Sequence, residues 1–172
     1  MEGEKHGKAK KYYDNGVLKN ECYYVYGKKN GRCLEYNYYG QLIFEGIFSN
    51  GKKNREGIYY YNDGKIRFEG YFLDNQKWSG KEYDKQGNIT LELKDGNGKG
   101  KSFFENGNLQ FEGEFLNGEK NGKCKEYYEN GQLKFEGKYL EGYKKNGKEY
   151  DSKGKLIFEG EYKYDNGSCF IM

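Results

Sequence analysis

The chain has 172 residues, a net charge of +3 and 20 tyrosines, and its 30 basic and 27 acidic residues are interspersed. The sequence shows no basic block that would indicate nucleic-acid binding and no apolar run of about 18 residues that would span a membrane. It begins without the pattern of a signal peptide, so the compartment stays open: cytoplasmic for this chain, exported if an upstream leader has been removed.

Four cysteines, Cys22, Cys33, Cys124 and Cys169, are spread along the chain, and His6 is its only histidine. Because none of the cysteines forms a close Cys-x-x-Cys pair, we expect no metal site and no cofactor. We expect the cysteines to serve as small apolar side chains in the interior. The alternative is a disulfide framework, which is typical of small, cysteine-dense secreted chains.

A glycine recurs at intervals of 20 to 24 residues and is often preceded by Asn or Asp, as in Asn15-Gly16 and Asp63-Gly64. Such dipeptides between apolar-patterned runs are a strong signal for a β-hairpin, because both residues tolerate positive φ. The seven turn glycines are Gly16, Gly40, Gly64, Gly87, Gly107, Gly131 and Gly154. We therefore predict seven repeats, at 7–30, 31–54, 55–77, 78–97, 98–121, 122–144 and 145–172, in a single array over 1–172.

Residues at fixed offsets from each turn glycine share a character. Position −4 is aromatic in every repeat, position +2 is Leu or Ile, positions +4 and +8 are mostly aromatic, and position +5 is always Glu. Offsets +2, +4 and +8 fall on one face of a strand and +5 on the other, so we expect an apolar face and a solvated one. The seven position −4 aromatics form the candidate binding or packing face: Tyr12, Tyr36, Tyr60, Tyr83, Phe103, Tyr127 and Tyr150.

Position +6 lies on the apolar face and yet is usually Gly, within a recurring Phe-Glu-Gly signature. A glycine in a strand packs nothing, and we expect it to leave room for a large ring from a neighbouring strand. The signature pairs are Phe44 with Gly46, Phe68 with Gly70, Phe111 with Gly113, Phe135 with Gly137, and Phe158 with Gly160.

Each repeat thus reads as strand, turn, strand and a second turn rich in Gly, Asn and Lys. Short connections require antiparallel neighbours, and the chain contains no proline that would interrupt a ladder. The predicted fold is all-β: an elongated, twisted and curved antiparallel meander of about 14 strands. The irregular repeat at 78–97 is the best candidate for a bend or break.

The stretch Phe111-Glu112-Gly113-Glu114-Phe115-x-x-Gly118-x-x-x-Gly122 resembles the MORN repeat, whose consensus is an aromatic residue, Glu-Gly, a further residue, a second aromatic residue and spaced glycines. The turn pattern Asn-Gly-x-Leu is similar to the bacterial variant of this repeat found in antitoxins of the YwqK type. The resemblance implies successive β-hairpins and a role in protein scaffolding, dimerisation or contact with phospholipid headgroups. The antitoxin likeness implies a toxin protein as the partner.

The Glu at position +5 raises the question of paired catalytic carboxylates. A Glu repeated in every copy is better explained as a ladder that pairs with Lys or Tyr across strands, so we expect no enzyme. The leading hypothesis is a non-enzymatic scaffold that binds an unidentified protein, with self-association through edge strands as a further option. Membrane-surface attachment and cell-surface glycan binding are the alternatives, and no nucleic-acid partner is expected.

Overall fold

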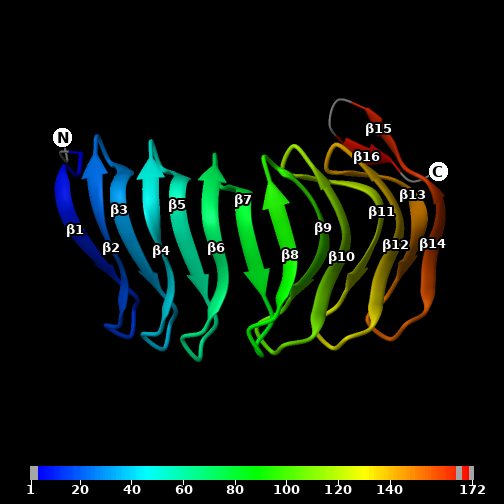
Figure 1. The fold of residues 1–172 in the computed structure, drawn as a ribbon, viewed down its shortest axis with the longest axis horizontal. Helices are drawn as coiled ribbons and strands as arrows, with labels where there is room; N and C mark the ends of the chain where they lie inside the picture. The colour runs from blue at the N-terminus through cyan, green and yellow to red at the C-terminus, as the bar shows by residue number, and fades with distance from the viewer. Residues whose placement is uncertain (1–3, 166–167, 171–172) are drawn as a thin grey trace. The chain divides into compact units, whose positions relative to one another are not determined.

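A computed structural model describes residues 4–165 and 168–170 and shows an all-β chain (Figure 1). The chain divides into two compact units, residues 1–89 and 90–172, and each is described by itself. The boundary falls inside the repeat that the sequence singled out as irregular. Within the described residues, no helix has the length and apolar character needed to cross a membrane.

Unit 1 is an antiparallel meander in which each strand pairs with the next one along the chain. Its strands, labelled in Figure 1, are β1 (Gly7–Tyr12), β2 (Leu18–Val25), β3 (Lys28–Tyr36), β4 (Leu42–Ser49), β5 (Lys52–Tyr60), β6 (Ile66–Leu73) and β7 (Gln76–Tyr83). The predicted succession of hairpins is confirmed.

Unit 2 repeats this arrangement and adds a separate hairpin. Its strands are β8 (Ile89–Lys94), β9 (Asn97–Phe103), β10 (Leu109–Leu116), β11 (Glu119–Tyr127), β12 (Leu133–Leu140), β13 (Tyr143–Tyr150) and β14 (Leu156–Glu161), followed by β15 (Lys163–Asp165) and β16 (Ser168–Phe170). The last two strands pair only with each other in the described part of the chain.

The two kinds of turn use glycine differently. In the second turns two successive residues have positive φ, as at Asn117 (52°) and Gly118 (80°), which is the two-residue hairpin turn that matches strand twist. In the central turns, by contrast, Gly16 has a φ of 81° while Asn15 acts through its side chain: Oδ1 accepts a hydrogen bond of 3.0 Å from the Val17 amide. The hairpin was predicted correctly, but Asn15 contributes a side-chain hydrogen bond and not the positive φ that we expected.

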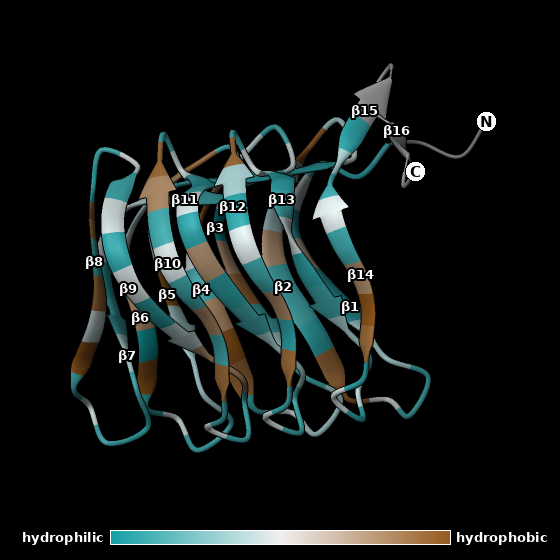
Figure 2. Cartoon of the chain, turned by 90° about the vertical axis from the view of Figure 1, so that its right-hand side faces the viewer, coloured by the Kyte–Doolittle hydropathy of each residue, from teal (hydrophilic) through white to brown (hydrophobic). Residues whose placement is uncertain are grey.

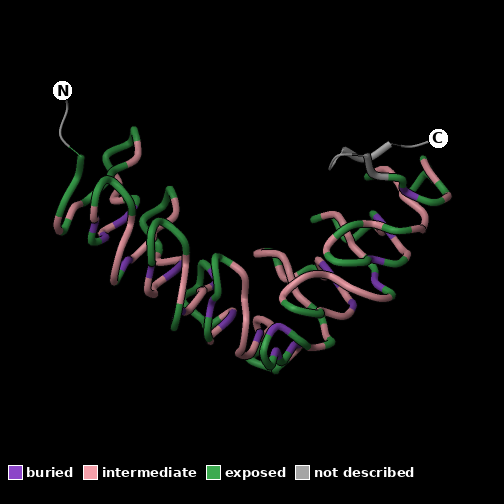
Figure 3. Tube along the Cα trace, turned by 90° about the horizontal axis from the view of Figure 1, so that it is seen from above, coloured by how far each residue is buried: buried purple, intermediate pink, exposed green. Residues whose placement is uncertain are grey.

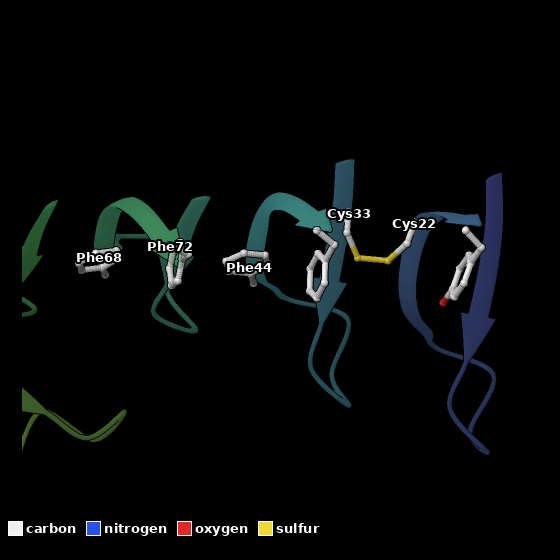
Figure 4. Packing of buried hydrophobic residues seen from close by; sticks show 7 residues of the cluster. Cys22, Cys33, Phe44, Phe68 and Phe72 are labelled. Atoms are coloured by element: carbon white, nitrogen blue, oxygen red, sulfur yellow. A yellow bond between two sulfur atoms is a disulfide. The ribbon is translucent and has the colours of Figure 1, made fainter. Parts of the chain in front are cut away.

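The core of each unit is built from the aromatic residues at positions +4 and +8, as predicted. Phe44, Phe68 and Phe135 are 0% exposed. Figure 3 shows buried residues recurring along the chain among intermediate and exposed ones, and Figure 4 shows the cluster of unit 1. The rings meet edge to face, as Phe44 and Phe72 do at a centroid distance of 5.7 Å.

The glycine at position +6 has the expected steric role, but the ring that covers it comes from its own strand. A Cβ at Gly46 would lie 2.6 Å from Cζ of Phe44 and 2.9 Å from Cα of Gly57, its partner on β5. A glycine at position +6 often lies opposite a glycine of the next strand, as Gly46 does with Gly57 and Gly70 does with Gly80. The bare backbones let the sheet bend closely around each ring.

Position +2 was expected on the buried face, and that prediction was wrong. The register slips between positions +2 and +4: Tyr36 pairs with Leu42, whereas Glu35 pairs with Phe44. The extra residue is a β-bulge, which interrupts the strict alternation of faces. Ile66 is accordingly 37% exposed, and Figure 2 shows hydrophobic segments that continue toward the strand ends.

The expectation that all cysteines are apolar fillers was wrong for two of them. Cys22 and Cys33 face each other in register on β2 and β3 and form a disulfide (Figure 4). Cys124 is a free, buried cysteine, as expected. The side chain of Cys169 lies outside the described residues.

Candidate functional site

The buried face of unit 1 carries ion pairs beside its aromatic rings. Lys53 Nζ lies 3.1 Å from a carboxylate oxygen of Glu35 and 4.6 Å from the ring centre of Phe44. Lys29 donates a hydrogen bond to the same carboxylate. Burial disfavours the ionised form of Glu35, but the hydrogen bond from Lys29 and the charge of Lys53 outweigh it and lower the pKa. Glu35 is therefore ionised, and a lysine binds each of its two carboxylate oxygens.

The same arrangement recurs in other repeats, where a Lys near a ring pairs with a Glu of its own strand. The further pairs are Lys77 with Glu82 at 2.7 Å, Lys120 with Glu126, and Lys144 with Glu149. Burial lowers the pKa of Lys77, although the charge of Glu82 opposes this shift. The sequence did carry a signal for this network that our reasoning missed: Lys stands two residues after the tight second turn, and Glu stands at position −5.

The seven position −4 aromatics lie at the carboxyl ends of the odd-numbered strands, on the face that carries the +5 glutamates. Tyr12 is 58% exposed and the other six are half-buried, so they do not form the buried layer. Three hydroxyls instead donate to a glutamate of the preceding repeat: Tyr60 to Glu45, Tyr83 to Glu69 at 2.6 Å, and Tyr150 to Glu136 at 2.9 Å. Burial and the hydrogen bond to Glu45 raise the pKa of Tyr60 to about 12.

In unit 2 the +5 glutamates alternate with lysines across the strands, as the ladder hypothesis predicted. The register runs from Lys101 through Glu112, Lys125, Glu136 and Lys148 to Glu159. The corresponding N–O distances are 3.5 Å for Lys101–Glu112, 4.0 Å for Lys125–Glu136 and 3.2 Å for Lys148–Glu159. These exposed pairs each contribute little to stability, but they neutralise the glutamates of this face.

A shallow groove with a volume of about 850 Å³ lies on this face of unit 2. Small residues at the middle of successive strands form its floor: Gly113, Cys124, Gly137, Gly147 and Gly160. The side chains of the Lys–Glu ladder form its sides. The floor is backbone, because the side chains of this row, such as that of Cys124, point to the opposite, aromatic face.

Two lysines in the groove stand out. Lys123 of β11 and Lys138 of β12 are directly opposite in register, and both are exposed. Within the described residues neither of them forms an ion pair. Asn146 follows in the same row as the register partner of Lys138. The groove therefore presents adjacent donor groups with a surplus of positive charge, which suits a carboxylate or another anion.

The groups that could perform covalent chemistry are poorly suited to it. Burial raises the pKa of the Cys124 thiol to about 12, so the thiol is protonated and weakly nucleophilic at neutral pH. The interior glutamates are held by lysines. Among residues 4–165 and 168–170, no group of three or more His, Cys, Asp or Glu side chains is placed to hold a metal ion.

Comparison with known proteins agrees with the hairpin repeats. The profile described as a MORN repeat variant matches residues 5–26, 96–117, 120–141 and 145–167, and that of the MORN repeat matches residues 44–66. No curated protein matches the chain. With matched segments that cover more than half of its length and a meander of β-hairpins in both units, the chain belongs to the MORN repeat family.

Proposed function

We propose that the chain is a non-enzymatic interaction module that binds an acidic segment of a partner protein in the groove of unit 2. MORN repeats are generally protein or membrane interaction modules. The observation that carries the proposal is the pair Lys123 and Lys138. Like charges directly opposite one another destabilise a sheet, and neither of these two forms an ion pair within the described residues. A bound carboxylate would offset this repulsion.

The surroundings of the lysine pair favour a protein segment over a membrane surface. Glu112, Glu136 and Glu159 also line the groove and pair with lysines, so the unpaired positive charge is confined to Lys123 and Lys138 rather than spread over a surface that a sheet of anionic headgroups could cover. An extended chain, in contrast, can place its carboxylates between the lysines and lay its backbone over the glycine floor. A toxin protein is the partner class that the likeness to bacterial antitoxins suggests.

The variant Lys138→Glu tests the proposal with little risk to the fold. The equivalent position +7 is Glu114 in β10 and Glu161 in β14, so the array already accommodates Glu there. The substitution gives Lys123 an opposite charge across the strands and removes the positive surplus. Lys153→Glu is the matched control, because Lys153 is an exposed turn lysine of the same unit outside the groove.

Tagged wild-type protein and both variants would be used for affinity capture from the native host, with partners quantified by mass spectrometry and then tested as purified proteins. We expect an acidic partner that is retained by wild type and Lys153→Glu and lost by Lys138→Glu. The proposal is wrong if no protein is enriched on wild type over Lys138→Glu. It is also wrong if wild type instead sediments with phosphatidylglycerol vesicles in a Lys138-dependent manner, which would favour membrane attachment.

Self-association is a separate part of the proposal. β1 and β14 each pair with one strand in the described part of the chain, so each offers a free edge for strand addition. Light scattering over a range of protein concentrations would give a dimer mass if an edge pairs, and a constant monomer mass if it does not.

A further inference from the structure

A pocket with a volume of about 370 Å³ lies on the aromatic face of unit 2, the face opposite the groove. One row of the sheet crosses it: Ser102 of β9 is directly opposite Phe111 of β10, and Phe111 is directly opposite Glu126 of β11. We call this space the aromatic pocket. Its lining also includes Phe104, Gln110, Phe115, Lys120 and Lys134.

The aromatic pocket lies where one repeat lacks the interior ion pair. At position −5, the other odd-numbered strands from β3 to β13 carry Glu or Tyr, whereas β9 carries Ser102. Two residues after the tight second turn, the same strands carry Lys, whereas β9 carries Gly98. Repeat 98–121 has thus replaced both members of the pair by small residues. The space that a carboxylate and a lysine alkyl chain fill elsewhere is left open beside Phe111.

The missing lysine also uncovers an aromatic ring. In unit 1, Lys29 Nζ lies 4.8 Å from the ring centre of Phe48, which stands at position +8. Phe115 is the equivalent residue of β10, and the residue equivalent to Lys29 is Gly98, directly opposite Phe115. Phe48 is 4% exposed, whereas Phe115 is half-buried. The wall of the aromatic pocket therefore includes ring surface that a lysine covers in other repeats.

The other end of the aromatic pocket is more apolar than its equivalents. Three tyrosines at position −3 donate their hydroxyls to a backbone carbonyl of the next repeat, at 2.8 Å, 2.8 Å and 2.9 Å: Tyr13, Tyr61 and Tyr128. Phe104 holds this position in repeat 98–121 and has no hydroxyl to donate. The pocket thus has an aromatic wall at this end without the polar group that the three tyrosines carry.

The missing glutamate leaves room beside an ammonium group. Lys53 Nζ lies 3.1 Å from the carboxylate of Glu35, which belongs to the preceding repeat. Lys120 is the equivalent lysine of β11, and the preceding repeat offers it Ser102 in place of a glutamate. Lys120 pairs with Glu126 of its own strand, but its side chain is 36% exposed, against 17% for Lys53. A carboxylate that enters the pocket can take the place that Glu35 holds in unit 1.

We propose that the aromatic pocket binds a small arylcarboxylate, with the carboxylate beside Lys120 and Ser102 and the aryl group toward Phe104. The lining contains two ammonium groups and one carboxylate, because Lys134 adds a charge that forms no ion pair within the described residues. Charge-assisted hydrogen bonds to a carboxylate are strong, and aromatic rings pack favourably against each other.

The size of the aromatic pocket favours a whole small molecule. Its volume lies near the lower end of the range of about 300–1,000 Å³ that is typical of small-molecule sites. An Asp or Glu side chain of a partner protein would supply the carboxylate but would leave the Phe104 wall uncovered. The pocket and the groove lie on opposite faces, so this proposal does not rest on the proposed function.

The test is isothermal titration calorimetry of the full chain with 3-phenylpropanoate. Two comparators are 3-phenylpropanamide, which lacks the charge, and propanoate, which lacks the ring. The variant Ser102→Glu fills the pocket with the residue that β3, β7, β11 and β13 already carry at position −5, and its melting temperature would verify folding. Ser152→Glu is the matched control, since Ser152 is an exposed turn residue of the same unit outside the pocket.

A second variant, Lys134→Gln, keeps the test independent of Ser102. The preceding repeat carries Gln110 at the equivalent position, so the hairpin accommodates this residue. It removes the surplus positive charge without filling the pocket, and it should weaken the binding of 3-phenylpropanoate while leaving that of the amide unchanged.

We expect one molecule of 3-phenylpropanoate to bind each wild-type chain and to bind Ser102→Glu at least about tenfold more weakly, because the pocket is filled and a like charge is added. The amide and propanoate should both bind wild type more weakly. Ser152→Glu, and Lys138→Glu in the groove, should bind as wild type does. Absence of saturable binding, equal affinity for wild type and Ser102→Glu, or equal affinity for the amide would overturn the proposal.

Discussion

Lys53 Nζ lies 3.1 Å from the carboxylate of Glu35, although Lys53 is on β5, Glu35 is on β3 and β4 runs between them. The contact joins two hairpins through side chains that sit among buried rings. A single sheet with few aliphatic residues thereby covers its aromatic face with the alkyl chains of lysines and places each ammonium beside a carboxylate. The array is held together by charged side chains in its interior as well as by its hydrogen-bonded ladder.

Breaking one interior ion pair should cost much more than breaking an exposed one. Glu82 has a side chain that is 1% exposed and pairs with Lys77, so Glu82→Ala leaves a half-buried ammonium without this partner. We expect a loss of about 3 kcal/mol in the free energy of unfolding. The control Glu159→Ala, which removes an exposed pair with Lys148, should cost at most about 1 kcal/mol. Urea denaturation followed by circular dichroism measures both, and similar losses would contradict the distinction.

Acid should destabilise the chain partly through Glu126. Burial disfavours its ionised form, but the hydrogen bond and charge of Lys120, together with the hydrogen bond from Tyr139 and the charge of Lys144, outweigh burial and lower the pKa in the folded state. A folded-state pKa below the unfolded value contributes stability above the unfolded pKa of about 4.3, and that contribution is lost as the pH falls through the folded pKa. We expect Glu126→Gln to melt at a lower temperature than wild type at pH 7 and to lose less on acidification. Parallel curves of melting temperature against pH for the two proteins would refute this.

The glycines at position +6 should differ in tolerance even though they occupy the same place in the repeat. A Cβ at Gly137 would lie 2.1 Å from the carbonyl oxygen of Asn146, whereas the nearest atom to a Cβ at Gly160 is Cζ of Phe158 at 3.3 Å. We expect Gly137→Ala to cost about 1–3 kcal/mol through overpacking and Gly160→Ala to cost less. Thermal unfolding by calorimetry would show the order, and the reverse order would mean that steric room is not the reason for these glycines.

Reduction should weaken unit 1 through the Cys22–Cys33 disulfide, which closes a loop between residues 11 positions apart. A disulfide of this kind typically contributes about 2–4 kcal/mol. Dithiothreitol should therefore lower the melting temperature of wild type and leave that of Cys22→Ala/Cys33→Ala unchanged. Peptide mapping without reduction should recover residues 22 and 33 in one cross-linked fragment. Recovery of both as free thiols from air-oxidised protein would show that the bond does not form.

Much of the fold could be read from local chemistry. Turn glycines at a regular spacing and apolar residues at alternating positions determine hairpins, and Phe44 and Phe68 were placed correctly in the core. The errors came from features that neither the spacing of the turn glycines nor the positions counted from them can reveal. The bulge beside Leu42 reverses the face of position +2, and the pairing of Cys22 with Cys33 depends on a register that the spacing of the two cysteines does not reveal.

The candidate site was harder to predict than the fold. The position −4 aromatics such as Tyr83 and Tyr150 drew attention because they recur, yet recurrence marks what every repeat needs for stability. Lys123 and Lys138 are visible only when the register shows which side chains lie opposite one another. Leu34 and Lys125 occupy equivalent positions in the two units, and that difference likewise emerges only when the repeats are compared. Recognition surfaces in a repeat protein are found where copies differ, and that comparison requires the strand pairing.

Because Phe44 lies over Gly46 of its own strand, each of the five repeats with the Phe-Glu-Gly signature brings both the ring and the gap that receives it. A newly duplicated hairpin would therefore meet a compatible neighbour on either side without any compensating substitution. Stability in such an array grows by nearly equal increments as copies are added. The gene can then lengthen or shorten by whole repeats, and each spare copy is free to exchange its surface residues for a new partner while its interior stays the same.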